Sequence, residues 1–287
     1  MPNILSYRVV KITFSMRPKA LVSAIITTKN SERTIGTLLE SLKSKTHQNL
    51  ETILVDNSSS DKTVEIAKKF TNNVFKKGPE RSAQRNFGVK KAKGKYVLIV
   101  DADMELTKRV VESCVRRISD YKALIIPEKT VGEGLLVSIR KFEREMYMGD
   151  PTIEVARFFE KKVFNEFGGY DLSLTGTEDY DLPKRIMDRY GKNSIGWAKG
   201  WILHHEAGLT LIKQLKKKFY YASKSVLYVK KHPDLILTQG NMLFRAAYIR
   251  NWKKFLQRPL IAASFIFVRV LEAFAAFFGF IKGALTF

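Results

Sequence analysis

Two aspartates at the end of an apolar run are the residues of this chain best suited to chemistry. Asp101 and Asp103 follow residues 96–100 (YVLIV), a run rich in β-branched side chains that predicts a buried strand. Carboxylates at the end of a buried parallel strand lie at the sheet edge where α/β proteins bind ligands. Carboxylates spaced in this way suit a hard divalent cation, which can in turn bind a diphosphate. An acidic turn after the strand is the alternative interpretation.

Polar side chains also follow two earlier apolar runs. Thr27, Thr28 and Asn30 come after one run, and Asp56 directly follows the next. A binding crevice at the carboxyl ends of parallel strands requires polar groups at such positions. Asp56 is suited to accept a hydrogen bond from a base or a ribose, although a role confined to its turn fits equally well.

Two arginines one turn apart, Arg81 and Arg85, open a segment that predicts a helix over residues 81–92. The start of a helix that carries arginines suits an anion. Simple exposure of both side chains to solvent is the alternative.

The elements that position these side chains alternate between strands and helices. Short apolar runs predict the strands, and segments with one apolar face predict the helices. Such alternation predicts an α/β fold with a mostly parallel central sheet covered by helices on both faces. In chain order we expect strands at residues 21–27, 50–55, 73–75, 96–101 and 123–126, and helices at residues 34–45, 62–70, 81–92 and 110–118.

Composition limits the class of protein. The chain has 287 residues, of which 45% are hydrophobic, so it can bury a real core and extensive disorder is not expected. The single cysteine, Cys114, excludes an internal disulfide and a cysteine-rich metal site. The first residues contain no long apolar segment, so we expect no secretory signal and a cytoplasmic catalytic domain.

The formal net charge of +22 favours a polyanionic partner, which could be nucleic acid, an anionic membrane surface or a phosphorylated ligand. Lysines interleaved with apolar residues over residues 211–231 predict a basic amphipathic helix able to lie on anionic lipid. A solvated helix packed on the domain by its apolar face is the alternative.

The C-terminal segment, residues 259–287, is strongly apolar. Its two charge-free runs, 260–268 and 273–281, are separated by Arg269 and Glu272, which are spaced to pair on one helix face. Each run is shorter than the roughly 20 residues that a spanning helix needs. A single tilted span, a re-entrant or interfacial hairpin and a helix buried in a soluble oligomer all fit, and we favour monotopic or re-entrant membrane association.

Several motifs in a fixed order make the chain similar to the family 2 glycosyltransferases with the GT-A fold. The resemblance covers about residues 20–205. The strand–helix alternation gives way to basic and then apolar helices near residue 208, so we expect an N-terminal extension (1–20), a GT-A catalytic domain (21–208) and membrane-associated helices (209–287). The matching segments are residues 22–30 (VSAIITTKN), 53–61 (ILVDNSSSD), 81–88 (RSAQRNFG), 100–103 (VDAD), 167–171 (FGGYD) and 178–182 (EDYDL).

The resemblance implies a nucleotide-sugar donor, usually a UDP- or GDP-sugar, and a Mg²⁺ or Mn²⁺ ion. It implies that Asp56 contacts the base with Thr28 lining the same pocket, that Asp101 lies near the ribose and the metal, and that Asp103 holds the metal under the diphosphate. The other donor-binding candidates are Thr27, Asn30, Arg81 and Arg85.

The same resemblance assigns the acceptor side to Glu178 and Asp179, with Asp179 as the general base. A sugar hydroxyl is a poor nucleophile and needs proton removal as it attacks, and direct displacement would invert the anomeric centre. The alternative is an acidic first turn of a helix. A histidine following this region is implied to contact the metal or diphosphate; spacing does not separate His204 from His205, and we favour His205.

The sequence thus predicts an inverting, metal-dependent glycosyltransferase at the cytoplasmic face of the cell membrane, with a lipid-linked or growing glycan as acceptor. A polyprenyl-phosphate sugar synthase is the alternative, but its phosphate acceptor would need no general base. A nucleic-acid-binding protein would leave the carboxylates unexplained, so we expect no nucleic-acid partner. The oligomeric state stays open.

Overall fold

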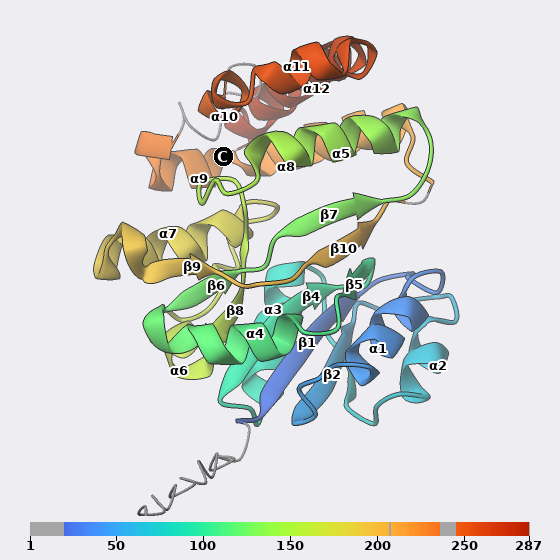
Figure 1. Ribbon diagram of the computed structural model, residues 1–287, viewed down its shortest axis with the longest axis vertical. Helices are drawn as coiled ribbons and strands as arrows, with labels where there is room; N and C mark the ends of the chain where they lie inside the picture. Colours follow the sequence, from blue (N-terminus) through green and yellow to red (C-terminus); the bar gives the residue numbers. More distant parts are fainter. Residues whose placement is uncertain (1–19, 207, 236–244, 287) are drawn as a thin grey trace, which may run out of the picture.

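The computed structural model describes residues 20–206, 208–235 and 245–286, so the expected N-terminal extension lies outside the described residues except for residue 20. A seven-stranded sheet with the order β3-β2-β1-β4-β8-β6-β9 forms its centre (Figure 1). Neighbouring strands run parallel except β8, which is antiparallel to both β4 and β6. The strands are β1 (Val22–Thr28), β2 (Leu50–Asp56), β3 (Val74–Lys76), β4 (Tyr96–Asp101), β6 (Ala123–Ile125), β8 (Ala156–Glu160) and β9 (Ile195–Trp197).

The register of the three central strands brings the polar residues at their ends together. In the β1–β2 pair Thr28 lies opposite Asp56, and in the β1–β4 pair Thr27 lies opposite Asp101. Because these strands are parallel, their carboxyl ends share one edge of the sheet. The predicted α/β fold and the common position of these side chains are confirmed.

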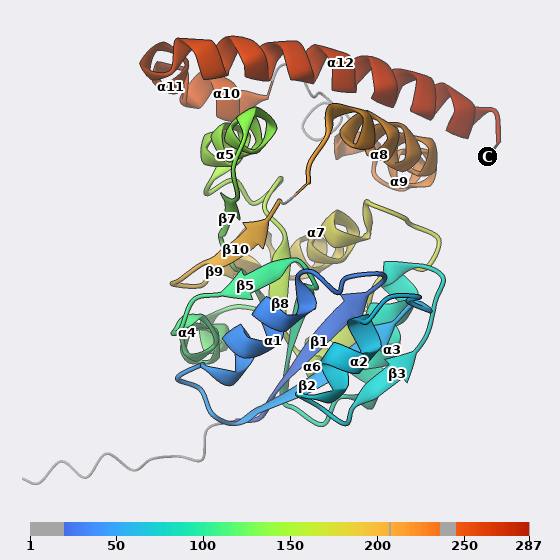
Figure 2. The ribbon, with the colours of Figure 1, turned by 90° about the vertical axis from the view of Figure 1, so that its right-hand side faces the viewer.

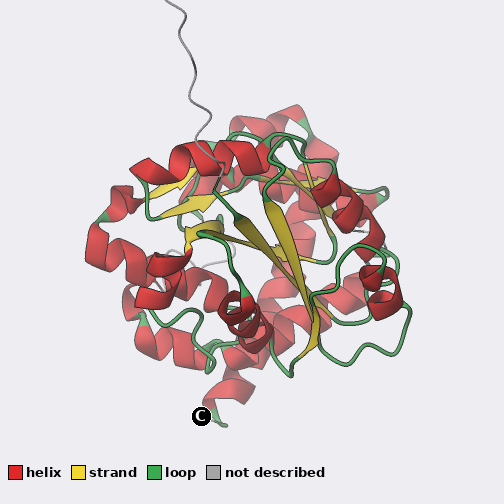
Figure 3. Cartoon of the chain, turned by 90° about the horizontal axis from the view of Figure 1, so that it is seen from below, coloured by secondary structure: helices red, strands yellow, loops and turns green. Residues whose placement is uncertain are grey.

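Helices cover both faces of the sheet (Figure 3). One apolar core joins the sheet to α1 and α4, and a second core on the other face joins it to α3, α6 and α7. The strands are therefore almost continuously apolar, as expected for a sheet buried on both sides. The covering helices are α1 (Ile35–Lys43), α2 (Thr63–Lys68), α3 (Arg81–Lys91), α4 (Val110–Arg117), α6 (Lys161–Glu166) and α7 (Glu178–Tyr190).

A second, three-stranded sheet stands beside the end of β4. Its order is β5-β10-β7, from β5 (Met104–Leu106), β10 (Ile202–His205) and β7 (Glu128–Val131). Strand β5 begins three residues after β4 ends, and His204 of β10 lies opposite Met104 of β5. This small sheet therefore carries a histidine to the aspartates that end β4.

The remaining helices form a separate layer on the side of the molecule where β7 and β10 end (Figure 2). The long helix α12 runs across the outside of this layer, and α5 and α8 lie between it and the sheets. The helices of the layer are α5 (Leu135–Tyr147), α8 (Leu211–Lys224), α9 (Val226–Lys231), α10 (Ala246–Arg250), α11 (Lys253–Gln257) and α12 (Pro259–Ala284).

Helix α12 packs closely on α8. A Cβ atom on Gly279 would come within 2.2 Å of the Phe219 carbonyl oxygen, and one on Gly283 within 2.2 Å of the Ser223 carbonyl oxygen, so only glycine permits this approach. Of the three arrangements considered for this segment, the hairpin is wrong, because α12 is one continuous helix of 26 residues through both apolar runs. The charges between the runs do not interrupt it, since both are buried against the neighbouring helices.

Candidate active site

The residues expected to bind the donor base lie together at the sheet edge. Thr28 Oγ1 donates a hydrogen bond of 2.9 Å to Asp56 Oδ1, and Asp56 Oδ2 accepts one of 2.8 Å from the Ser59 amide. Asn30, with a φ of 51°, accepts a hydrogen bond of 2.9 Å from the Ser60 amide. These contacts brace the loops after β1 and β2 against each other and fix the shape of this edge.

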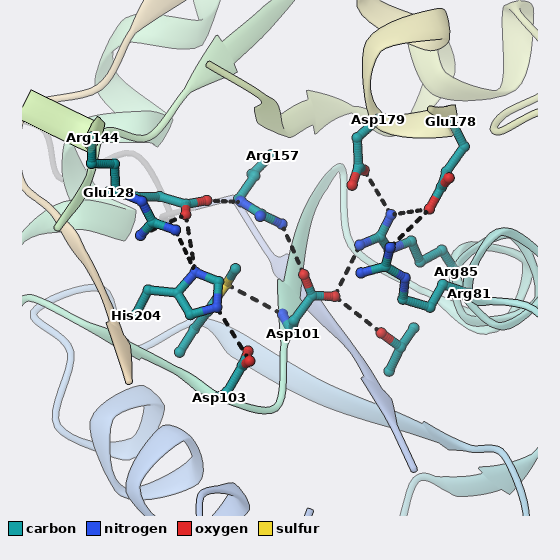
Figure 4. Close-up of polar contacts among 12 residues, drawn as sticks. Arg81, Arg85, Asp101, Asp103, Glu128, Arg144, Arg157, Glu178, Asp179 and His204 are labelled. Carbon is teal, nitrogen blue, oxygen red and sulfur yellow. Dashed lines mark hydrogen bonds and ion pairs between the residues drawn. The ribbon is translucent and has the colours of Figure 1, made fainter. Parts of the chain in front are cut away.

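A single buried guanidinium joins the aspartate at the end of β4 to the acidic start of α7 (Figure 4). Arg85 Nη2 donates to Asp101 Oδ1 at 2.9 Å, and Arg85 Nη1 donates to Asp179 Oδ1 at 2.6 Å and to Glu178 Oε1 at 3.4 Å. The Arg85 side chain is fully buried, with the Tyr170 ring 5.2 Å from its guanidinium. The structure therefore brings the predicted residues Arg85, Asp101, Glu178 and Asp179 into one cluster.

The other predicted arginine, Arg81, lies at the open side of this cluster. Its Nη2 donates to the Tyr221 hydroxyl of α8 at 3.1 Å and is 3.7 Å from Glu178 Oε1, while 37% of the side chain is exposed. The Tyr221 ring approaches so closely that a Cβ on Gly176 would lie 2.5 Å from it. The helical layer thus contributes directly to the wall of the site.

The second aspartate, Asp103, is paired with a histidine. His204 Nε2 lies 3.2 Å from Asp103 Oδ2, and His204 Nδ1 lies 3.2 Å from Glu128 Oε2. The expectation that His205 takes this place is not supported by the geometry, because His205 Nε2 instead contacts Glu105 Oε2 at 2.9 Å. Successive side chains of a strand point to opposite faces, so only one of the two histidines can face Asp103.

Three charged residues that the sequence did not single out complete the cluster. Arg157 of β8 donates from Nε to Glu128 Oε1 at 2.7 Å and from Nη1 to Asp101 Oδ2 at 3.5 Å. Arg144 of α5 lies 3.2 Å from Glu128 Oε2 and 3.0 Å from His204 Nδ1. Glu128 therefore connects the two aspartates of the β4 end. The sequence signal for this group is Arg157, a charge that directly precedes the two buried phenylalanines of its strand segment (ARFFE).

The arginines decide the ionisation of the first aspartate. Burial disfavours the charged form of Asp101, but Arg85 and Arg157 outweigh burial and hold the pKa of Asp101 well below its usual range. Glu178 behaves differently, because burial, followed by repulsion from Asp179, raises the pKa of Glu178 above its ordinary value. Neighbouring carboxyl groups of the cluster thus have different environments.

The histidine is also perturbed. Burial disfavours the imidazolium, but hydrogen bonds with Asp103 and Glu128 outweigh burial and raise the pKa of His204 to about 9. The ring of the metal-free protein therefore carries an extra proton at neutral pH. A cation that binds Nε2 must displace this proton, since only the neutral imidazole is a ligand.

The residues present fit a divalent cation that is shared with a ligand. Asp103 Oδ1 is buried and has no hydrogen-bond partner among the described residues, whereas Asp101 is occupied by two arginines. His204 holds its other ring nitrogen against the Glu128 carboxylate, the arrangement that orients metal-binding histidines. In the described ranges no group of three acidic, histidine or cysteine side chains is arranged to hold a metal. Asp103 and His204 would therefore need further ligands from a diphosphate or water.

The mostly parallel central sheet with helices on both faces is the GT-A fold. Two solved structures share it: TarS 1–349 from S. aureus in complex with UDP (19% identity, TM-score 0.52, covering 93% of this chain and 91% of that one) and the mannosyltransferase PcManGT from Pyrobaculum calidifontis in complex with GDP-Man and Mn²⁺ (15% identity, TM-score 0.65, covering 92% and 87%). At these identities the likeness is one of fold.

The sequence comparisons then give the family. Residues 23–172 match the family model described as Glycosyl transferase family 2. The putative glycosyltransferase EpsH of Bacillus subtilis is 32% identical over 236 residues, which cover 72% of this chain and 67% of EpsH. The chain belongs to glycosyltransferase family 2, and it is a glycosyltransferase.

Other relatives match over a shorter stretch. The Escherichia coli protein WfaP, named as a UDP-Glc:alpha-D-GlcNAc-diphosphoundecaprenol beta-1,3-glucosyltransferase, is 38% identical over 90 residues, covering 29% of this chain and 35% of WfaP. GlyA of Streptococcus pneumoniae is matched over 16% of its length. The chain thus spans well under half of these two relatives.

Proposed function

We propose that this protein is an inverting, metal-dependent glycosyltransferase that moves a sugar from a UDP- or GDP-sugar to a hydroxyl group of a lipid-linked or growing glycan. The observation that carries the proposal is the arrangement around Arg85. Asp103 and His204 lie on one side of Asp101, and Asp179 lies on the other side, held by the same guanidinium that holds Asp101.

On the donor side, Asp103 and His204 would hold Mg²⁺ or Mn²⁺, which supplies charge neutralisation for the departing diphosphate. The unpartnered Asp103 oxygen and the Glu128-oriented His204 ring support this role. Arg81 is the exposed cation of the cluster and is available to an anionic ligand. Thr27, whose Oγ1 donates to Asp101 at 3.2 Å, would fix the Asp101 carboxylate beside the ribose.

On the acceptor side, Asp179 would accept the proton of the attacking hydroxyl. Arg85 binds its Oδ1 and orients the carboxylate, and 15% of the Asp179 side chain is exposed compared with 2% for Glu178. Glu178 is too deeply buried to meet an acceptor directly, so it would instead balance the charge of Arg81 and Arg85. Direct displacement by the activated hydroxyl would invert the anomeric centre.

The helical layer, which consists of α5 and the helices after residue 208, would bring this site to the cytoplasmic face of a membrane. Within the described residues, α12 is the helix long and apolar enough to cross a membrane, but it lies flat over α5 and α8 (Figure 2). Large apolar side chains of this helix are 58–83% exposed, namely Leu260, Phe267, Phe274, Phe277 and Phe278, and Leu285 directly after the helix is 85% exposed. Such a face suits insertion parallel to the membrane surface.

The first experiment is a screen of UDP- and GDP-sugars for release of nucleoside diphosphate with and without Mn²⁺. We expect slow release from one donor class that requires the metal and increases with an acceptor. Release that is independent of metal for every donor would contradict the proposed donor site. Transfer to a polyprenyl phosphate rather than to a sugar hydroxyl would identify a polyprenyl-phosphate sugar synthase instead.

A further inference from the structure

The buried charges of α12 belong to a chain of ion pairs that does not end at the helix. Arg269 Nη1 contacts Glu143 Oε1 of α5 at 2.7 Å, and Glu143 Oε2 contacts Arg140 Nη1 at 2.7 Å. Arg269 also contacts Glu272 one turn along α12, and Lys218 of α8 lies 3.9 Å from Glu272. Arg269 and Glu272 are almost completely buried, so this group fixes α12, α8 and α5 relative to one another.

The chain continues from α5 to the site. Glu206, next to β10, lies 3.8 Å from Arg140 Nε and 3.9 Å from Arg144 Nη2. Arg144 then contacts Glu128 at 3.2 Å and His204 Nδ1 at 3.0 Å. Glu143 and Arg144 lie three and four residues after Arg140, so each is one turn along α5 from Arg140. Any shift of α5 that follows release of Glu143 therefore moves Arg144 as well.

We infer that Arg269 and Glu143 are positioning residues for the catalytic centre, which fix α5 against α12 so that Arg144 holds the Glu128 carboxylate that aims the His204 ring at Asp103. The inference rests on the proposed role of Asp103 and His204 in binding the donor with its metal ion. It assigns to the C-terminal helix a part in donor binding, in addition to any contact with lipid.

The chemistry of the Arg269–Glu143 contact supports a role in positioning α5 rather than in packing alone. Removing two charges from water costs free energy that their attraction barely offsets, and apolar residues of similar volume often stabilise such a site equally well. A guanidinium held by a carboxylate has a defined direction that apolar packing lacks. Apolar residues could thus take over what the charges of this contact contribute to stability, but not their role in positioning α5.

The test replaces the charged pair of α12 by apolar residues of similar size in the variant Arg269→Met/Glu272→Leu. Calorimetry would measure the affinity for UDP or GDP, whichever the unmodified protein binds more tightly, with and without Mn²⁺. We expect the enhancement of affinity by Mn²⁺ to fall roughly 2- to 30-fold, the range for residues that couple two sites. The affinity without metal should change little, and the thermal midpoint should fall only moderately because Glu143 keeps Arg140 as a partner.

The matched control is Arg258→Met. Arg258 also joins α12 to α5, through Glu145 Oε2 at 2.9 Å, but this contact lies outside the chain of ion pairs that leads to His204. The control should keep the full Mn²⁺ enhancement. An equal loss in the control would show a general loosening of α12 and would overturn the inference, as would a double variant with unchanged enhancement.

A second variant covers the possibility that the double replacement does not fold. Arg140→Gln interrupts the chain between Glu143 and Glu206 at a side chain that is 25% exposed, so its effect on folding is smaller. It should reduce the same Mn²⁺ enhancement, and an unchanged value would refute the inference. If the unmodified protein binds neither nucleotide with Mn²⁺, the proposed function fails; if it binds and the variants match it, only the positioning role fails.

Discussion

Replacement of Asp179 by Asn separates activation of the acceptor from binding of the donor. Asp179 Oδ1 accepts a hydrogen bond of 2.6 Å from Arg85 at the start of α7. Asparagine has the same size and retains one acceptor oxygen, so Arg85 keeps a partner. An amide cannot accept the proton of a hydroxyl group, and we therefore expect a specific loss of turnover.

The magnitudes follow from the contacts. General-base catalysis contributes typically about 100- to 10,000-fold, so the barrier should rise by about 3–5 kcal/mol. Stability should fall far less, because Arg85 retains Asp101 at 2.9 Å and Glu178 at 3.4 Å. Exchanging a charge-assisted hydrogen bond for a neutral one costs about 1 kcal/mol, which corresponds to a decrease of about 2–4 °C in Tm.

The assay measures kcat for transfer with the donor found in the nucleotide-sugar screen, together with donor affinity by calorimetry and the anomeric configuration of the product by NMR. Asp188→Asn is the matched control, because Asp188 is an exposed residue of the same helix, paired with Lys184. We expect the control to retain normal turnover. Near-normal turnover of Asp179→Asn, or a product with retained configuration, would refute the mechanism and leave a phosphate acceptor, which needs no general base, as the next candidate.

Three further predictions test the donor site, the outer face of α12 and the buried network. His204→Ala should remove most of the Mn²⁺-dependent affinity for nucleoside diphosphate, measured by calorimetry, whereas His205→Ala should not. Equal losses in the two variants would mean that His205 is as good a candidate for the metal-binding histidine as His204. Phe274→Ser/Phe278→Ser should weaken sedimentation with anionic vesicles in high salt, because salt screens lysines but not apolar area; unchanged binding would exclude this face. Burial opposes ionisation of Glu143, but its arginine partners outweigh burial and lower its pKa to about 2 from 4.5. Its contribution to stability is thus present above about pH 4.5 and lost as pH falls toward 2. The free energy of unfolding in urea should therefore depend less on pH in that window for Glu143→Gln than for the unmodified protein. The same pH dependence in both proteins would contradict a lowered pKa of Glu143.

The strands and helices of the catalytic half could be predicted because each is bounded by a sharp change in pattern. The strand predicted at residues 96–101 is β4, and the helix predicted at 81–92 is α3 with a difference of one residue at its end. Strand β8 was not predicted, although its segment is apolar. It inserts antiparallel between β4 and β6, and nothing local in a sequence identifies the partners of a strand.

The candidate site could be predicted in part for the same reason. Residues at the ends of consecutive parallel strands must converge, and Asp101, Asp56 and Thr28 do so. The choice between His204 and His205 depends on which face of β10 meets Asp103, and that face is set by pairing with β5 across about a hundred residues of chain. Glu128 could not be predicted from the sequence. Its role comes only from its contacts in space with Arg157 and His204, which connect it to Asp101 and Asp103.

The position of Arg269 and Glu272 also decides how α12 can meet a membrane. These charges interrupt the apolar runs in the sequence and argue for two short segments, yet in the structure they hold one long helix to the protein. A spanning orientation would separate Arg269 from Glu143 and leave buried charges without partners, at a cost of several kcal/mol. Insertion parallel to the surface keeps every buried pair and uses only side chains that are already exposed. We therefore expect α12 to dock flat on lipid, with the layer that contains Tyr221 and Arg144 lying between the membrane and the Asp101–Asp103 centre.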